Sequence, residues 1–171
     1  MSVLGAEFGE GDEFIRKILK HPVFTRELRL IEGSERTREF CKHDITHLLD
    51  VARIAYIICL EKKLDIPKYA VYAAALLHDI GRGREYTDGT PHELAGIRLA
   101  MIVLEDIGLE EEDIRLISDA IGNHRDVNVT ANDDLAGILY TADKLSRRCY
   151  RCDAYDNCNW EESKRNETIV Y

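Results

Sequence analysis

Apolar residues recur with helical spacing along most of the chain, in segments separated by glycine, proline and short polar stretches. No strand-like alternation, hairpin dipeptide or internal repeat stands out. We therefore expect an all-α fold, a compact single-domain bundle of helices. Helices are predicted from Asp12 to Pro22, Val23 to about Ile31, Asp44 through Cys59, Pro67 to Gly81, Thr90 to Gly108, Glu111 to Ile121, and Asp133 to about Arg147.

Capping signals mark several of these boundaries. Asp12 and Asp44 are expected to cap the helices that follow them. Thr90, Pro91 and Glu93 have the spacing of a capping box, which predicts a helix start at Thr90. Helix ends are predicted at three glycines, Gly81, Gly108 and Gly122.

The length of 171 residues suits one domain with a core of its own. We expect a mobile leader at 1–11, the helical domain at 12–148, and a cysteine-containing segment at 149–171 packed on or next to it. The chain has no apolar run of about 18 residues, and its N-terminal stretch is acidic, so a cytoplasmic protein without a membrane partner is expected. The net charge of −9 disfavours nucleic acid as the main partner but allows a small anionic substrate.

Five cysteines, an odd number, argue against a disulfide framework. Cys149, Cys152 and Cys158 lie close together in sequence, and Cys41 is a candidate fourth ligand. Four thiolates suit a structural Zn²⁺ ion or an iron–sulfur cluster. A redox-active pair and packed free thiols are the alternatives.

Histidines and aspartates occupy positions where the helical pattern predicts burial. His78 and Asp79 follow an alanine-rich apolar run, and a buried carboxylate needs a compensating cation. His47 shares an apolar stripe with Val51 and Ala55. Nitrogen and oxygen donors of this kind suit one or two divalent ions, among them Mn²⁺, Fe²⁺, Co²⁺, Ni²⁺, Zn²⁺ and Mg²⁺. The candidate metal ligands are His47, His78, Asp79, His92, His124 and Asp143.

The order His47, His78-Asp79, Asp143 resembles the H…HD…D signature of the HD-domain superfamily of metal-dependent phosphohydrolases. His78-Asp79-Ile80-Gly81 matches its HDIG variant, and the resemblance covers about residues 40–147. It implies an all-helical core in which these four residues bind one metal. Members with two metals use additional histidines, which His92 and His124 match in order, and the aspartate of the HD pair bridges the ions.

The resemblance implies hydrolysis of a phosphoester or phosphoanhydride bond in a small phosphorylated metabolite, with a nucleotide favoured. Asp79 would organise a metal-bound water, and His92 or His124 would serve as acid if not ligated. His43, four residues before His47, is a candidate second-sphere or substrate contact. The expected phosphate-binding cations are Arg82 and Arg84, in a predicted loop at 82–89, together with Arg125 and Lys144.

Two subfamilies are disfavoured, because the GYP element of cyclic-dinucleotide phosphodiesterases and the HDxxED pattern of guanosine-tetraphosphate hydrolases are absent. The small size is closer to diadenosine-tetraphosphate hydrolases or 5′-nucleotidase-like members. An HD-type di-iron oxygenase and a non-catalytic metal or redox sensor are the rival readings. The sequence leaves open the substrate, the native metal and its number, the role of the cysteines and the oligomeric state.

Overall fold

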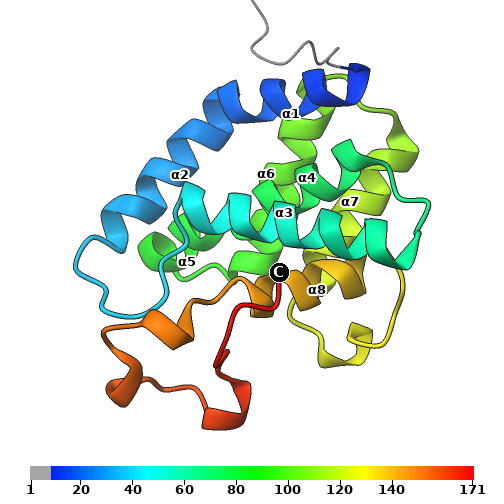
Figure 1. Ribbon diagram of the computed structural model, residues 1–171. Helices are drawn as coiled ribbons and strands as arrows, with labels where there is room; N and C mark the ends of the chain where they lie inside the picture. The colour runs from blue at the N-terminus through cyan, green and yellow to red at the C-terminus, as the bar shows by residue number, and fades with distance from the viewer. Residues whose placement is uncertain (1–8) are drawn as a thin grey trace, which may run out of the picture.

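The computed structural model describes residues 9–171. Within this range the chain folds into α-helices and short 3-10 helices without a strand, so the all-α prediction is confirmed (Figure 1). The α-helices are α1 (Glu10–Lys20), α2 (Pro22–Ser34), α3 (Ile45–Lys62), α4 (Lys68–Leu77), α5 (Arg82–Asp88), α6 (His92–Asp106), α7 (Glu111–Asn123) and α8 (Leu135–Leu145). The 3-10 helices are η1 (Val127–Val129), η2 (Cys149–Arg151), η3 (Tyr155–Asn157) and η4 (Glu162–Lys164).

Helix α4 is the centre of the bundle and packs against α1, α3, α7 and α8. Its residues from Ala70 to Leu77 are buried except for Tyr72, which is partly exposed. Four alanines keep the helix narrow, so its neighbours can approach closely from several sides. The C-terminal end of α4 is therefore fixed deep inside the molecule.

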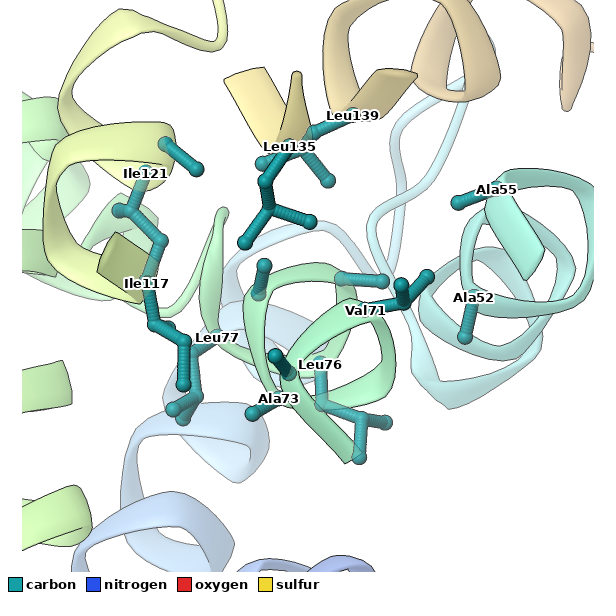
Figure 2. Close-up of a cluster of buried hydrophobic side chains, with 14 of the residues drawn as sticks. Ala52, Ala55, Val71, Ala73, Leu76, Leu77, Ile117, Ile121, Leu135 and Leu139 are labelled. Atoms are coloured by element: carbon teal, nitrogen blue, oxygen red, sulfur yellow. The ribbon is translucent and has the colours of Figure 1, made fainter. Parts of the chain in front are cut away.

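Figure 2 shows how the surrounding helices fill the core around α4. Small residues of α3, Ala52 and Ala55, face Val71 of α4. Larger side chains arrive from the other side, from α7 and α8. Burial of these apolar groups is worth about 0.8 kcal/mol per methylene group, so the core holds the helix ends rigidly in place. The residues from α7 and α8 are Ile117, Ile121, Leu135 and Leu139.

Gly81 brings the turn after α4 against the first turns of α6. A Cβ atom at Gly81 would lie 2.1 Å from the carbonyl oxygen of His92 and 2.5 Å from the amide nitrogen of Gly96. The predicted role of Gly81 as a helix stop is wrong, because α4 already ends at Leu77 and Gly81 has a φ of −76°. Glycine is needed here for the close approach, which carries Asp79 towards His92.

Two predicted helix starts are displaced. Helix α1 begins at Glu10, so it takes in the end of the segment expected as a leader, while residues 1–8 of that segment lie outside the described range. Asp12 is not a cap but binds Lys68 Nζ at 2.7 Å. The capping box at Thr90 is not formed: α6 begins at His92, and the Thr90 amide donates to the Asp88 side chain.

Other boundaries differ for similar reasons. The segment expected as a loop at 82–89 forms α5, because Gly83 packs closely on Leu30 of α2 and its carbonyl accepts a bond from Thr87. Tertiary packing here outweighs the loop-like composition. Helix α7 continues through Gly122, and α8, predicted to start at Asp133, begins at Leu135 with Asp134 as its cap. The predicted cap at Asp44 is confirmed, since its carboxylate accepts from the amides of the first turn of α3.

The C-terminal segment, orange to red in Figure 1, leaves α8 and forms loops and 3-10 turns at one end of the bundle. Cys149 is the one buried hydrophobic residue within 149–171. In the part of the chain that the structure describes, no helix is both long and apolar enough to cross a membrane.

Candidate metal centre

Five helix ends converge on one buried point. His78 and Asp79 come from the C-terminal end of α4, and the side chains of the histidines at the ends of α6 and α7 meet them. Asp79 and the three histidines after α3 are at most 1 % exposed. All six predicted metal ligands lie around this point. The residues are His47 of α3, His78, Asp79, His92 of α6, His124 after α7 and Asp143 of α8.

The carboxylate of Asp79 divides these donors into two sets. Its Oδ2 lies 3.3 Å from His78 Nε2 and 3.8 Å from His47 Nε2. Its Oδ1 lies 3.7 Å from the Nε2 atoms of both His92 and His124. In each set of three, the ligand atoms all lie within 4.8 Å of one another. Asp143 joins the first set, with Oδ1 3.6 Å from His47 Nε2.

Each histidine is held by its other ring nitrogen. His78 Nδ1 is 2.7 Å from the Ala75 carbonyl, and His124 Nδ1 is 2.6 Å from the Ile121 carbonyl. His92 Nδ1 is 3.0 Å from Glu85 Oε2. These acceptors place the proton on Nδ1 and leave the lone pair on Nε2.

The ring nitrogens that face the centre have no partner within the protein. The Nε2 atoms of His47, His78, His92 and His124 are buried without a hydrogen bond. Asp79 Oδ1 also lacks one, although it forms an ion pair with Arg82 Nε. Leaving so many buried polar atoms unsatisfied is costly. Divalent metal ions would satisfy all of them at once, so the donor set fits one ion in each half of the centre.

Protonation also suits metal binding. Burial lowers the pKa of His47 to about 4, so its ring is neutral at pH 7. Burial opposes ionisation of Asp143, but the neighbouring His78 and Lys144 lower its pKa to about 2. For His78, burial acts to lower the pKa, yet the attraction of Asp79 outweighs it and the pKa is raised. Metal binding at His78 requires an unprotonated Nε2.

The predicted phosphate-binding cations separate into two groups. Arg82 Nε lies 2.8 Å from Asp79 Oδ1, and Arg125 donates to Glu93 at 3.0 Å. These two arginines and Lys144, which pairs with Asp143, line one cavity. Arg84 does not join them: it binds the fully buried Glu27 at 2.7 Å, and the structure places it away from the cavity lining.

Glu35 is a site residue that the sequence pattern missed. Its carboxylate accepts the His43 amide at 2.7 Å, lies 2.6 Å from His43 Nδ1 and accepts from Tyr86 Oη at 2.5 Å. Burial opposes its ionisation, but the bonds from His43 and Tyr86 lower the pKa of Glu35 to about 2. His43 Nε2 then points towards the centre, 3.8 Å from Asp79 Oδ2. Glu35 follows the end of α2, one turn after Ile31 on the same face as Phe24, so its place on that apolar face is the signal that the sequence analysis missed.

A cavity of about 540 Å³ opens from the centre to the surface. His43, His47, His124 and Asp143 form its inner wall. Seven arginines and two lysines line it against four carboxylates, whereas the chain as a whole carries a net charge of −9. The cavity therefore attracts anions that the rest of the surface repels.

The HD domain family matches residues 44–148, so the chain belongs to the HD-domain family. A crystal structure of a predicted HD superfamily hydrolase from an uncultured Thermotogales bacterium superposes with a TM-score of 0.60 and 25% identity, covering 88% of this chain and 86% of that one. The family match and the similar fold thus both agree with the resemblance to HD domains that the order of the candidate metal ligands indicated.

Two relatives in sequence extend the comparison. An uncharacterised protein of Clostridium beijerinckii is 43% identical over 137 residues, which are 80% of this chain and 85% of that protein. The bifunctional uridylyltransferase/uridylyl-removing enzyme of Mycobacterium tuberculosis is 31% identical over 108 residues. That alignment covers 60% of this chain but 13% of the mycobacterial enzyme.

Proposed function

We propose that the protein is a metal-dependent phosphohydrolase that acts on a small phosphorylated metabolite, with a nucleotide as the favoured class. The observation that carries the proposal is the position of Asp79, whose two oxygens face two separate sets of buried histidines at the inner end of a cationic cavity. This arrangement fits a pair of divalent ions joined by one carboxylate, next to a site that attracts anions.

The ions would be held by His47, His78 and Asp143 on one side and by His92 and His124 on the other, with Asp79 between them. When bound, they supply a water of lowered pKa and polarise the phosphoryl oxygens. In this proposal the two later histidines act as ligands, because their Nε2 atoms both face Asp79 Oδ1. The role of acid that the sequence left to them then falls to another residue.

His43 is the side chain in position to handle that proton. Its Nε2 faces the cavity, while Glu35 holds Nδ1 at 2.6 Å and fixes the ring. A histidine oriented by a carboxylate is a common arrangement for general acid–base work. We propose that His43 Nε2 delivers a proton to the leaving oxygen of the substrate.

Cations in the cavity would neutralise the charge that develops on the phosphoryl group. Arg125 and Lys144 lie beside the histidines, and Arg82 is anchored on Asp79. Each is held by a carboxylate of the protein, which keeps it oriented before the substrate arrives.

The size of the cavity supports a small molecule, since about 540 Å³ is within the usual range for small-ligand sites. Two of the comparisons support the type of reaction: the similar Thermotogales structure is called a predicted hydrolase, and the similar mycobacterial protein is called uridylyl-removing. Removal of a uridylyl group cleaves a phosphoester bond to a nucleotidyl group, which supports phosphoester hydrolysis.

The test is phosphate or nucleotide release from a panel of nucleotides and dinucleoside polyphosphates with added Mn²⁺, Co²⁺ or Fe²⁺. We expect turnover on one substrate class and a loss of at least about a thousandfold in Asp79→Ala, because both ions lose their shared ligand. Asp119→Ala, an exposed carboxylate on α7, is the matched control and should keep full activity. Equal inactivity on every substrate and metal, or O₂ consumption without phosphate release, would overturn the proposal.

A further inference from the structure

Four of the five cysteines gather at the outer part of the same cavity. Cys149, Cys152 and Cys158 come from the C-terminal segment, and Cys41 comes from the loop before α3, more than a hundred residues earlier. The fifth, Cys59 of α3, is buried in the hydrophobic core of the bundle. All five are free thiols, so the convergence is not explained by disulfide bonds.

The backbone turns in the C-terminal segment place the cysteines at a regular spacing. The amide of Cys152 donates to the Cys149 carbonyl, that of Tyr155 to Cys152, and that of Cys158 to Tyr155. Since a 3-10 turn has about three residues, residues three apart lie on the same side. The successive turns therefore keep the three cysteines close together along the chain, and all three line the cavity that Cys41 also lines.

The thiols are close enough to influence one another. Burial raises the pKa of the Cys41 thiol; Arg147 opposes the shift, and Cys149, Cys152 and Cys158 add to it. A bound metal would stabilise the thiolate form of each of these cysteines.

The segment that carries these cysteines is ordered without a hydrophobic core of its own. Short turns and polar contacts hold it, above all the guanidinium of Arg165, which donates to the carbonyls of Tyr155, Cys158 and Trp160. The side chain of Asn166 binds the last carbonyls of α8. Segments with several cysteines and little apolar burial usually need a bound metal for stability.

The spacing of the sulfur atoms indicates the kind of metal group. Around one Zn²⁺ ion with Zn–S bonds of about 2.3 Å, the sulfurs would lie about 3.8 Å apart. Within residues 9–171, the sets of three or more donor atoms that lie within 4.8 Å of one another contain histidine and aspartate but no cysteine. No three cysteine sulfurs of the described residues therefore lie as close together as one zinc ion would hold them, so a larger group of metal and sulfide atoms is the better fit.

We propose that Cys41, Cys149, Cys152 and Cys158 bind an iron–sulfur cluster in the outer wall of the cavity. The site is separate from the histidine and aspartate centre and does not depend on the proposed hydrolysis. Because Cys41 is two residues from His43, the cluster would also fasten the loop before α3 to the C-terminal segment and hold the wall of the cavity in place.

The experiment is to purify the full chain without oxygen, reconstitute it with Fe²⁺ and sulfide, and measure iron, zinc and acid-labile sulfide per chain. Sulfide is the decisive quantity, because a histidine and carboxylate centre binds iron without it. We expect about two to four sulfides per chain, with a visible charge-transfer absorption. We expect at least a tenfold loss of sulfide in Cys152→Ser and Cys158→Ser, and no loss in Cys59→Ala, the cysteine outside the cavity.

Folding of the serine variants is checked by their helical circular dichroism and by Mn²⁺ binding at the histidine centre, both of which should be unchanged. Absence of labile sulfide from the reconstituted wild type would overturn the proposal. So would sulfide that persists in both folded serine variants, or one Zn²⁺ per chain that the same cysteines hold without sulfide.

Discussion

The histidine and aspartate centre and the cysteine site line the same cavity but are built in opposite ways. Donors of the first are fixed at helix ends by the core, and backbone carbonyls hold the rings of His78 and His124. Donors of the second lie on a loop and on 3-10 turns, where Cys149 alone is buried. The first centre is therefore prepared before a metal binds, whereas the second should gain much of its order from its ligand.

The largest effect on the prepared centre short of losing a ligand is expected from Glu35→Gln. The variant removes the charge that holds His43 Nδ1, so we expect kcat to fall by about 10- to 100-fold while Mn²⁺ still binds. Steady-state kinetics beside metal titration measures both quantities. Glu32→Gln, an exposed carboxylate on α2 outside the cavity lining, is the matched control. An unchanged kcat would show that His43 takes no part in turnover.

Metal removal should separate the two regions. After treatment with a chelator, we expect amide hydrogen exchange in 149–171 to accelerate by about tenfold or more, while the amides of α4 stay protected. The reason is that α4 is held by apolar packing on every side and the C-terminal segment is not. Equal protection of the C-terminal segment with and without metal would show that this segment does not need a bound metal for its order.

The pH dependence of stability tests the Glu35 contact alone. Its folded pKa of about 2 is below the ordinary value of 4.5, so the stabilisation by the ionised carboxylate is complete above pH 4.5 and is lost as the pH falls towards 2. The shift corresponds to roughly 3 kcal/mol. In metal-free protein, the difference in unfolding free energy between wild type and Glu35→Gln should shrink by about this amount over that range. A difference that stays constant with pH would show that the carboxylate is not charged in the fold.

The smallest effects should distinguish Arg125, which lines the cavity, from Arg84, which does not. Arg125→Ala should raise KM several-fold with little change in stability, because its head group faces the cavity. Arg84→Ala should leave KM unchanged and lower stability by about 1–2 kcal/mol, since buried Glu27 loses a partner. Kinetics and thermal unfolding of the two variants measure this, and a raised KM in Arg84→Ala would contradict the assignment.

The sequence was informative where a polar residue interrupts a buried pattern. The inward positions of His47, His78, Asp79 and Asp143 follow from the apolar stripes around them. The structure brings all four together, with His78 and Asp79 buried and His47 and Asp143 half-buried. The all-helical fold follows from the same periodicity.

What the sequence did not reveal depends on contacts between distant segments. Glu35 continues the buried face of α2 just beyond the end of the helix, but its role exists only because His43 and Tyr86 reach it. Helix α5 forms because Gly83 packs against α2, and Arg84 faces Glu27 instead of the cavity. No local pattern carries this information, since each case is decided by a neighbour far away in the chain.

The most direct test of the account is the number of Mn²⁺ ions bound per chain, measured by titration calorimetry under metal-free starting conditions. Mn²⁺ prefers oxygen and nitrogen donors to thiolates, so it reports on the histidine and aspartate centre and not on the cysteines. We predict two ions in the wild type, one in His92→Ala and none held tightly in Asp79→Ala, because Asp79 serves both halves. Two ions still bound tightly in Asp79→Ala, or no binding in the wild type, would contradict the central claim.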